Sequence, residues 1–396
     1  MKNKNKELLE FFSRTIEEVF SMEEFKKKLE SGKQLKIKYG VDVTAPTLHI
    51  GHAVNLWMLR AMQDMGHKIQ FLIGDFTTQI GDPTGKSKTR PMISKEEIDS
   101  NTETFINSVK SVLRFDDPNL IEIRRNSEWY DKIGVAEFLK LLSLVTHSKL
   151  ISRDMFKKRI KESQDIYMHE MLYPVLQGYD SVMLESDLTI VGTDQLFNEM
   201  LGRIYQEKFG QSPQVVITTK LTPGIDGKEK QSKSIGNYIG LAHSPKDKFG
   251  RAMSIPDNLI IPYLEVYTTV PLDEIKILKK NLSKDPMSAK KYLAEKIVER
   301  YHGSEVASQE RKWFEDTFSS KNVPDDIKVI EDSSLATVFD AMLLYFKNEK
   351  TNSDIRRLFS QNAVSQNGNK ITDIKTSVFD GDLIKVGKRD WFKVKK

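Results

Sequence analysis

The sequence predicts an α/β fold: a doubly wound parallel-sheet domain with a helical insertion, a helical domain and a small C-terminal α+β module. Residues 35–41 alternate like a strand, an apolar helix follows and ends at Gly66, and residues 69–75 form a buried strand. Strand, helix and strand in this order imply a right-handed crossover, the first unit of such a sheet. The pattern returns where a strand at 188–191 leads through a helix into a strand at 215–219.

The remaining segments complete the domain plan. An amphipathic helix opens the chain, and residues from about 95 to 165 are mostly helical, with a strand-like stretch at 120–123. We interpret the whole region from about 95 to 165 as an insertion between the two halves of the sheet. Helical patterns dominate from about 245 to 325, and residues 321–326 read as a linker. The expected domains are 1–225 with the insertion at about 95–165, 226–325, and 333–396.

Composition excludes several classes of protein. Of 396 residues, 39% are hydrophobic and 30% are charged, which is ordinary for a globular chain. The 61 basic and 56 acidic residues give a net charge of +5, mild evidence for a polyanionic partner. The absence of cysteine excludes disulfides and cysteine nucleophiles and fits a reducing cytoplasm. No apolar run resembles a signal peptide or spans a membrane, so we expect a cytoplasmic enzyme.

Two histidines at the start of a helix are the first candidates for chemistry. His49 and His52 lie beyond the carboxyl end of the first strand, where ligands bind in doubly wound sheets. The helix N-terminus favours an anion and lowers the pKa of imidazole, so neutral N–H donors are expected. Such donors can stabilise charge on a phosphoryl group. The alternative is that both side chains only cap the helix. Zinc is disfavoured, because no third ligand is evident.

A lysine pair far downstream is the second candidate. Lys230 and Lys233 lie between Gly227 and Gly236, which indicates a mobile loop. Lysine binds phosphates as a point charge. Taken alone, a lysine cluster is more often a solvated surface. Beside the histidines, it predicts a site that holds a nucleoside triphosphate and points to an ATP-dependent adenylating enzyme.

A polar stripe on an otherwise apolar helix is the third candidate. Tyr173, Gln177 and Asp180 are spaced i, i+4 and i+7, which places a hydroxyl, an amide and a carboxylate on one face. Such a stripe either faces solvent or lines a buried pocket. Gln195, just beyond a strand end, is placed to point into the same crevice.

In this order, the motifs resemble bacterial tyrosyl-tRNA synthetases, class I aminoacyl-tRNA synthetases with a Rossmann-type catalytic domain, along nearly the whole chain. The class signatures stand here as His49-Ile50-Gly51-His52 and, in the KMSKS-type loop, Lys230-Gln231-Ser232-Lys233-Ser234. The segment from Tyr173 to Asp180 looks like the tyrosine-binding helix, which narrows the amino acid. Further family motifs are matched by Gly192-Thr193-Asp194-Gln195 and by Ile73-Gly74-Asp75-Phe76-Thr77 with Gly81-Asp82-Pro83-Thr84.

The resemblance implies roles for individual residues. Asp180 would accept the phenol hydroxyl of L-tyrosine, and the ammonium and carboxyl ends would be held by Asp82, Tyr173, Gln177 and Gln195. ATP would be contacted by Gly40, Asp42, Thr44, His49, Gly51, His52, Gly192 and Asp194. The departing pyrophosphate would be clamped by Lys86, Arg90, Lys230 and Lys233. Because the tyrosine carboxylate is itself the nucleophile, the site needs only positioning and charge stabilisation, with Mg²⁺ carried by ATP and not chelated by protein.

Three positions depart from the family pattern. Gln231 replaces a methionine of the lysine loop, although both lysines are retained. Val43 stands where proline usually follows the aspartate, which would loosen the turn before Thr44. Lys38 occupies a position where some members place a tyrosine that contacts the substrate phenol, and where others carry lysine. Recognition of the phenol would then depend more heavily on Asp180.

The C-terminal module resembles the ribosomal-protein S-four type of RNA-binding fold. Ser353 is a natural N-cap for a basic helix start, and Asn367-Gly368 and Asp380-Gly381 are hairpin signals. The RNA contacts would come from Arg356, Arg357, Lys388 and Arg389. The alternative is an ordinary solvated face, since local basicity alone is a weak signal.

The leading hypothesis is a homodimeric tyrosine–tRNA ligase with tRNA(Tyr), L-tyrosine and ATP as partners. A class I synthetase-like adenylating enzyme for another aromatic amino acid or acceptor is the alternative. A small nucleotidyltransferase is disfavoured by the length, the lysine loop and the C-terminal module. A non-catalytic RNA-binding relative is disfavoured by the retained histidines and lysines.

Overall fold

The computed structural model describes residues 2–44, 48–81, 94–232, 235–319, 327–347, 349–387 and 390–396. The chain divides into two units, Met1–Ser304 and Glu305–Lys396, and each is described by itself. Among the described residues, no helix is both long enough and apolar enough to cross a membrane.

A mixed sheet organises the first unit. In the described part of the chain it has six strands in the order β1-β6-β5-β2-β3-β4, all parallel to their neighbours except the edge strand β1. The strands are β1 (Ile16–Phe20), β2 (Lys36–Val41), β3 (Lys68–Ile73), β4 (Ile121–Arg125), β5 (Leu188–Gly192) and β6 (Val215–Thr219). Because the strand order reverses between β2 and β5, the predicted doubly wound fold is confirmed.

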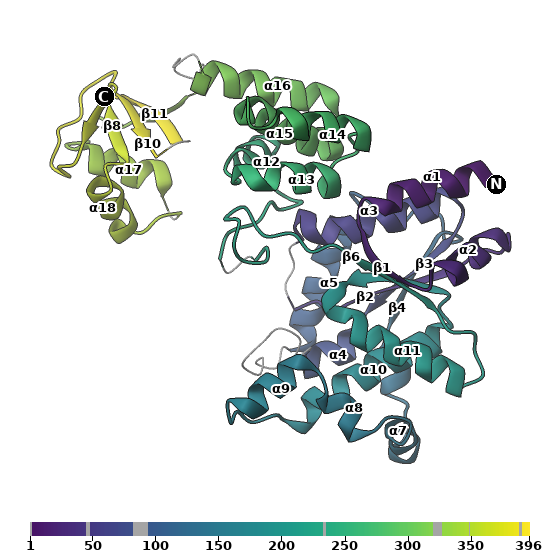
Figure 1. Cartoon of the computed structure of the whole chain (residues 1–396). Helices are drawn as coiled ribbons and strands as arrows, with labels where there is room; N and C mark the ends of the chain where they lie inside the picture. The colour runs from purple at the N-terminus through teal and green to yellow at the C-terminus, as the bar shows by residue number, and fades with distance from the viewer. Residues whose placement is uncertain are drawn as a thin grey trace. The chain divides into compact units, whose positions relative to one another are not determined.

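Helices cover both faces of this sheet (Figure 1). Helices α3 (Ile50–Asp64) and α5 (Lys95–Val109) pack in one hydrophobic cluster, and α10 (Met168–Leu184) and α11 (Leu196–Lys208) pack in another. Strands enclosed in this way carry nearly continuous apolar runs, and all five residues of β6 are buried.

Strand β4 corrects the sequence interpretation. It pairs in parallel with β3 over Ile121–Arg125, so α5 and β4 continue the first half of the sheet. The strand-like stretch at 120–123 is therefore not part of an insertion, and that prediction was wrong. Its partner strand lies some 50 residues earlier, which local periodicity cannot reveal. The short helices that follow are α6 (Ser127–Tyr130), α7 (Val135–Leu142), α8 (His147–Ile151) and α9 (Asp154–Lys161).

The region after the lysine loop is helical, as predicted. Helix α12 (Pro245–Met253) packs on α15 (Pro286–His302), and α13 (Ile260–Tyr267) packs on α14 (Leu272–Asn281), α15 and α3. Buried Arg14 fastens this region to the start of the chain, because its guanidinium donates to the carbonyls of Glu265 and Val270 at 2.8 and 2.9 Å. The remaining elements of this unit are α1 (Lys2–Ser13), α2 (Met22–Glu30), α4 (Asp75–Ile80), η1 (Thr193–Gln195) and η2 (Asp257–Leu259).

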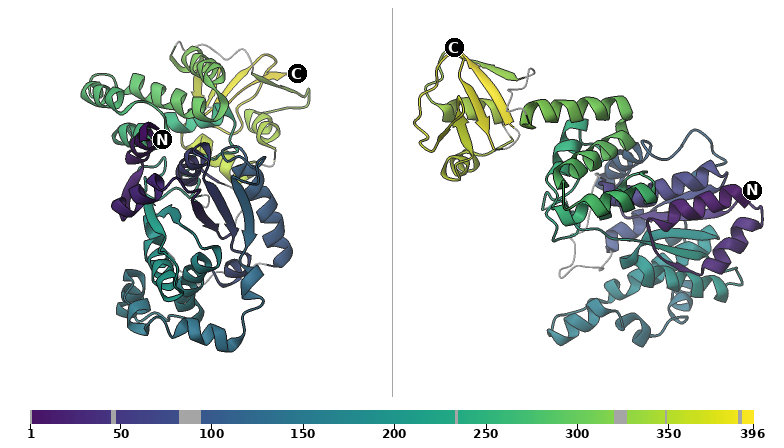
Figure 2. Two further views of the ribbon diagram at one scale, coloured as in Figure 1. Left: turned by 90° about the vertical axis from the view of Figure 1, so that its right-hand side faces the viewer. Right: turned by 45° about the horizontal axis from the view of Figure 1, so that its top comes forward.

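The second unit contains a small α+β module (Figure 2, yellow). Its described strands form a sheet in the order β7-β11-β10-β8-β9, with a separate hydrophobic core shared with two helices. Its elements are α16 (Ser304–Phe314), η3 (Glu315–Ser319), β7 (Lys328–Glu331), α17 (Val338–Phe346), α18 (Asn352–Ser360), β8 (Val364–Gln366), β9 (Asn369–Ile371), β10 (Leu383–Val386) and β11 (Asp390–Lys395).

Two turn and cap predictions in this module have opposite outcomes. The Asn367-Gly368 turn joins antiparallel β8 and β9 with positive φ at both residues, so the predicted hairpin is confirmed. The predicted N-cap Ser353 was wrong. The cap is Thr351, whose side chain accepts from the Asp354 backbone N–H, while the Asp354 carboxylate accepts from Thr351. This reciprocal capping box requires an acid three residues after the cap, which Ser353 lacks.

Candidate active site

A cavity of about 800 Å³ lies at the carboxyl ends of β2 and β5, where the strand order reverses. Strands β2 and β5, helices α3 and α10 and the lysine loop all contribute to its wall. The predicted site residues that line it are Gly40, Asp42, Thr44, His49, Gly51, His52, Tyr173, Gln177, Asp180, Gly192, Asp194, Gln195 and Lys230. Segments up to about 190 residues apart thus meet at the crevice where a doubly wound sheet binds its ligands.

The other predicted residues are placed differently. Arg356 and Arg357 lie on α18 in the second unit. Asp82, Lys86, Arg90, Lys233, Lys388 and Arg389 lie outside the described residues.

The two histidines cap α3 and still present a donor each. His49 is the N-cap, and its Nδ1 accepts from the Gly51 backbone N–H at 3.2 Å, while the Nδ1 of His52 accepts from the His49 N–H at 3.3 Å. An accepting Nδ1 carries no proton, so each neutral ring carries its proton on Nε2. Helix capping and donation by Nε2–H are therefore compatible in this geometry.

The environment keeps both rings neutral. Burial lowers the pKa of His49 to about 2, with His52 and Lys230 contributing. Desolvation by the surrounding protein atoms lowers the pKa of His52 to about 4, with Lys230 contributing and Asp194 opposing, although part of the residue is exposed at the cavity. Above pH 6 the pair is uncharged and donates hydrogen bonds without adding positive charge.

Gly51 allows the His49 ring to lie close to the backbone at the start of α3. The ring centroids of His49 and His52 are 3.8 Å apart. A Cβ at Gly51 would lie 2.9 Å from the His49 ring, a distance that side chains do not tolerate.

The described part of the lysine loop is anchored on both sides. Lys230 Nζ lies 2.9 Å from Asp194 Oδ2 across the cavity, and the Asn237 side chain accepts from the Ser232 N–H at 2.8 Å. Gln231 is buried, and its amide donates to the Tyr267 hydroxyl at 2.8 Å. The glutamine at this position therefore has a polar partner on α13, which its sequence neighbours did not reveal.

Tyr173 and Asp42 join the two halves of the predicted site. The Tyr173 hydroxyl donates to Asp42 Oδ2 at 2.9 Å, and Thr77 Oγ1 donates to Asp42 Oδ1 at 2.8 Å. Thr77 follows β3, so the carboxyl ends of two adjacent strands and α10 position the same carboxylate.

Asp180 forms a buried acceptor at the end of the cavity. Trp129 Nε1 donates to Oδ1 at 3.0 Å and Asn126 Nδ2 donates to Oδ2 at 3.5 Å. Burial raises the pKa of this carboxyl to about 7, opposed by the positive charge of Lys38. Sequence reasoning missed Asn126 and Trp129. The one available signal was that they directly follow β4, whose carboxyl end reaches the same edge of the sheet.

Lys38 lies inside the wall of the cavity, beside Asp180. Its Nζ is 2.8 Å from Glu199 Oε2 and donates to Ser181 Oγ at 2.8 Å. Glu199 lies on α11, about one helical turn after Gln195. Sequence reasoning missed it because it belongs to none of the motifs used.

Comparison with known proteins shows that the chain is a class I tRNA synthetase and which family of that class it belongs to. Residues 29–319, more than half of the chain, match the family described as "tRNA synthetases class I (W and Y)". The chain is 42% identical over 387 residues to the tyrosine–tRNA ligase of Oleidesulfovibrio alaskensis, covering 95% of this chain and 96% of that protein. It is 41% identical over 393 residues to the enzyme of Francisella tularensis, covering 98% of each. The chain belongs to the tyrosine–tRNA ligase family.

Solved structures support the same fold. A C-terminally truncated mitochondrial tyrosyl-tRNA synthetase from Aspergillus nidulans superimposes with a TM-score of 0.63 at 22% identity, covering 78% of this chain and 94% of that one. The tyrosyl-tRNA synthetase from Archaeoglobus fulgidus in complex with L-tyrosine gives 0.59 at 20% identity, covering 77% and 99%. At this identity the likeness concerns the fold alone.

Proposed function

We propose that the cavity between β2 and β5 forms tyrosyl-adenylate from L-tyrosine and ATP, and that the tyrosyl group then passes to the 3′ end of tRNA(Tyr). The observation that carries this proposal is the convergence of a neutral histidine pair, a lysine and a buried aspartate on one cavity, in a chain of this family. Tyrosine-dependent exchange of pyrophosphate into ATP tests the first half-reaction. Attachment of labelled tyrosine to tRNA tests the second.

The amino acid would occupy the end of the cavity formed by α10. Asp180 would accept the phenol hydroxyl, since its carboxylate lies buried at that end. Gln177 and Tyr173, about one and two turns nearer the helix N-terminus than Asp180, would hold the ammonium group with Asp82. Gln195, beyond β5, would lie beside the carboxyl group.

ATP would lie over the start of α3. Gly40, Asp42, Thr44 and Gly51 would contact it on one side, and Gly192 and Asp194 would contact the ribose. The Nε2–H groups of His49 and His52 and the charges of Lys230, Lys233, Lys86 and Arg90 would stabilise negative charge as the substrate carboxylate attacks the α-phosphorus and pyrophosphate leaves. Positioning and charge stabilisation suffice for such a step.

Mg²⁺ would enter with the phosphates of ATP and neutralise part of their charge. In the described part of the chain, no cluster of three or more His, Asp or Glu side chains is placed to hold a metal ion. In the proposed arrangement the phosphate oxygens of the nucleotide are its main ligands.

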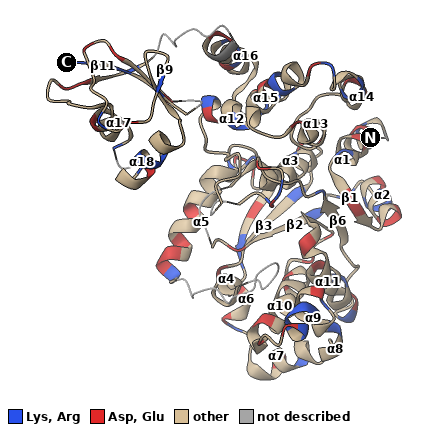
Figure 3. Ribbon diagram, turned by 60° about the vertical axis from the view of Figure 1, so that its left-hand side comes forward, with Lys and Arg blue, Asp and Glu red and all other residues tan. Residues whose placement is uncertain are grey.

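The expected division of labour is that residues 1–225 bind the two small substrates, 226–325 carry the lysine loop and helices facing the tRNA, and 333–396 bind RNA. Arg356 and Arg357 are exposed on α18, where Figure 3 marks basic positions in blue. Strand β7, before residue 333, pairs with β11 and belongs to the same module. The cytoplasmic location expected from the sequence stays a prediction.

Removing residues 327–396 is expected to lower the rate of tRNA charging at least about tenfold while sparing pyrophosphate exchange, because phosphate contacts supply much of the affinity for RNA. Charging by the full chain should weaken more steeply with added salt than exchange does, because many more phosphates are contacted in RNA than in ATP. Equal loss of exchange and charging would contradict an RNA-binding role for the module.

A homodimer would cover an apolar surface on the segment between β4 and β5. Val135, Leu139 and Met168 are 77%, 57% and 69% exposed, and an apolar cavity of about 280 Å³ opens beside them, lined by Phe138 and Leu172. Exposed apolar side chains on one segment favour an interaction site, and the family resemblance implies that the partner is a second copy.

Met168→Glu is expected to convert a dimer of twice 45.6 kDa into monomers in sedimentation equilibrium, because a charge would enter an apolar interface. Ile277→Glu on α14 is the matched control, since Ile277 is 60% exposed and lies outside this segment. A wild-type chain that sediments as a monomer would contradict the proposal.

A further inference from the structure

Glu199 is shared among three donors although its side chain is only 2% exposed. Its Oε1 accepts from the Gln177 amide at 2.8 Å. Its Oε2 accepts from the Gln214 amide at 2.8 Å and lies 2.8 Å from Lys38 Nζ. Both oxygens are therefore occupied within the protein, even though Glu199 and Lys38 line the substrate cavity.

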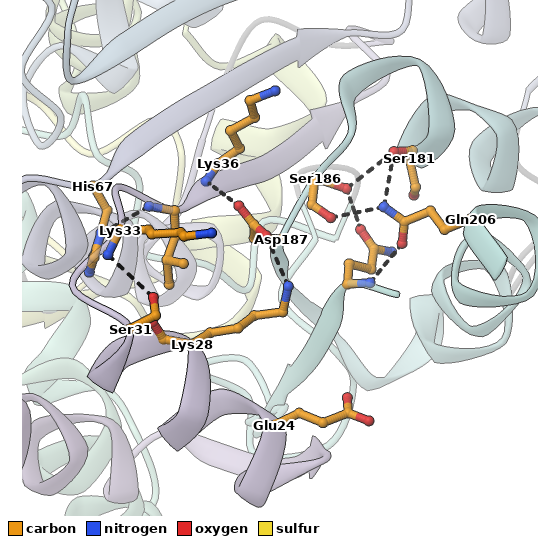
Figure 4. A network of polar contacts seen from close by, with 12 residues as sticks. Glu24, Lys28, Ser31, Lys33, Lys36, His67, Ser181, Ser186, Asp187 and Gln206 are labelled. Carbon is orange, nitrogen blue, oxygen red and sulfur yellow. Dashed lines mark hydrogen bonds and ion pairs between the residues drawn. The ribbon is translucent and has the colours of Figure 1, made fainter. Parts of the chain in front are cut away.

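A buried polar network behind Glu199 holds it in place. Ser186 Oγ donates to Gln214 Oε1 at 2.6 Å, and the Gln214 backbone N–H donates to Gln206 Oε1 at 2.7 Å. The Gln206 amide in turn donates to the carbonyls of Ser181 and Ser186 (Figure 4). Lys38 joins the same network through Ser181 Oγ. The hydrogen bonds of such a buried network restrict the orientation of the side chains that take part in it.

The carboxylate dictates which way the Gln177 amide points. A carboxylate oxygen only accepts hydrogen bonds, so the NH₂ group of Gln177 must face Glu199. Asn198 Nδ2 supports this orientation by donating to Gln177 Oε1 at 2.7 Å. An amide oxygen has two lone pairs, so one acceptor site of Gln177 is left for a ligand in the cavity.

The charge of Lys38 explains why the carboxylate acts on Gln177 and not on the substrate. An unpaired buried carboxylate is costly, and at this place it would attract a cation directly. With Lys38 in contact the pair is neutral. The ammonium group of a substrate therefore meets an oriented amide oxygen instead of a bare charge.

We propose that Glu199, neutralised by Lys38, is a positioning residue that fixes the carbonyl oxygen of Gln177 toward the ammonium group of the amino-acid substrate. This inference rests on the proposed function and assigns a task to two residues that no motif marks. Neither residue touches the reacting atoms. Their effect should appear in recognition of the ammonium group and not in the rate of the chemical step.

Glu199→Gln tests the inference, because its amide cannot accept from all three donors and Gln177 becomes free to turn over. We expect KM for tyrosine to rise about 10- to 100-fold, since the lost hydrogen bond involves a charged ligand. The value of kcat and KM for ATP should stay within about twofold.

Two probes that lack part of tyrosine make the test specific. By calorimetry, tyramine, which has the ammonium group, should lose affinity for the Glu199→Gln protein. By contrast, 3-(4-hydroxyphenyl)propionate, which lacks this group, should bind as it does to the wild-type chain. Equal weakening of both probes, or of neither, would overturn the inference.

Two further variants guard against misfolding. Lys38→Met with Glu199→Gln removes both charges together and leaves no unpaired ion. Because Lys38 also lowers the pKa of Asp180, this variant should weaken both probes through the phenol and should weaken tyramine further. Glu122→Gln is the matched control, because Glu122 pairs with Lys68 at 2.9 Å and accepts from the Gln70 amide at 2.9 Å, yet does not line the cavity. It should leave both probes unaffected. If the wild-type chain shows no tyrosine-dependent pyrophosphate exchange, the proposed function fails. If it shows exchange but the two probes do not respond differently to Glu199→Gln, only this inference fails.

Discussion

Asp180→Asn is expected to lower the preference for tyrosine over phenylalanine about 10- to 100-fold, the range for a hydrogen bond to a charged group. The wild-type carboxylate is buried and positioned by Trp129 and Asn126, so phenylalanine would leave it without a ligand hydroxyl. An asparagine amide can be satisfied in other ways, and the penalty on phenylalanine falls. The ratio of kcat/KM for the two amino acids in pyrophosphate exchange measures the effect.

The same carboxyl should give tyrosine binding a pH dependence. Its pKa is raised from 3.8 to about 7, chiefly by burial, with Lys38 opposing and with Tyr130, Trp129 and Asn126 as its polar neighbours. Because the phenol donates to the charged form, tyrosine affinity should fall up to tenfold per pH unit below about pH 7. Asp180→Asn should lose this slope.

The stability of the folded chain should depend on pH in the opposite direction to tyrosine affinity. Since the pKa is higher in the folded chain than in the unfolded one, the folded chain binds more protons between about pH 4 and 7. The contribution of Asp180 to the free energy of unfolding should therefore decrease as the pH rises through that window.

Asp187→Asn serves as the matched control. Asp187 accepts from the Lys36 backbone N–H at 3.0 Å and pairs with Lys28 at 2.9 Å, away from the cavity (Figure 4). Its replacement should lower stability and leave discrimination unchanged. A Tyr-to-Phe preference that survives in Asp180→Asn would refute the role assigned to Asp180.

Lys230→Ala is expected to slow formation of tyrosyl-adenylate about 10²- to 10³-fold, the usual effect of removing one preorganised electrostatic contact to a transition state. The side chain of Lys230 is 65% exposed and held only at its tip, 2.9 Å from Asp194, so its loss removes charge without removing packing. Lys233→Ala should act in the same direction. Single-turnover measurements at several tyrosine concentrations separate the rate from the dissociation constant.

The dissociation constant for tyrosine should stay nearly unchanged in Lys230→Ala, because the lysine loop faces the nucleotide side of the cavity in the proposed arrangement. Lys228→Ala is the control on the same loop, exposed but not lining the cavity. Equal losses in rate and in tyrosine binding would indicate that Lys230 is structural.

The sequence predicted features that depend on local pattern. The first strand, the helix after His49 and the second strand are visible as periodicity, and their order implies the sheet. Pairing between strands that are distant in the sequence produces no local pattern from which it could be predicted. Strand β4 was misplaced because its partner β3 is remote in sequence, and Asn126 was missed with it.

The residues of the candidate site likewise fall into those that the sequence predicted and those that it did not. Motif residues such as His52 and Asp180 were found, and the described residues predicted to bind tyrosine or ATP line one cavity. Glu199 and Trp129 were not found, because their relevance depends on which side chains they meet in three dimensions. The Thr351 cap is a different case, since the acid at Asp354 was readable in the sequence and favoured Thr351 over Ser353.

Pyrophosphate exchange into ATP with tyrosine, tryptophan and phenylalanine compared side by side tests the central claim most directly. We expect rapid exchange with tyrosine and far slower exchange with the other two, because of the three amino acids only tyrosine brings a hydroxyl group to Asp180. Exchange that is absent with tyrosine, or faster with tryptophan or phenylalanine, would contradict it.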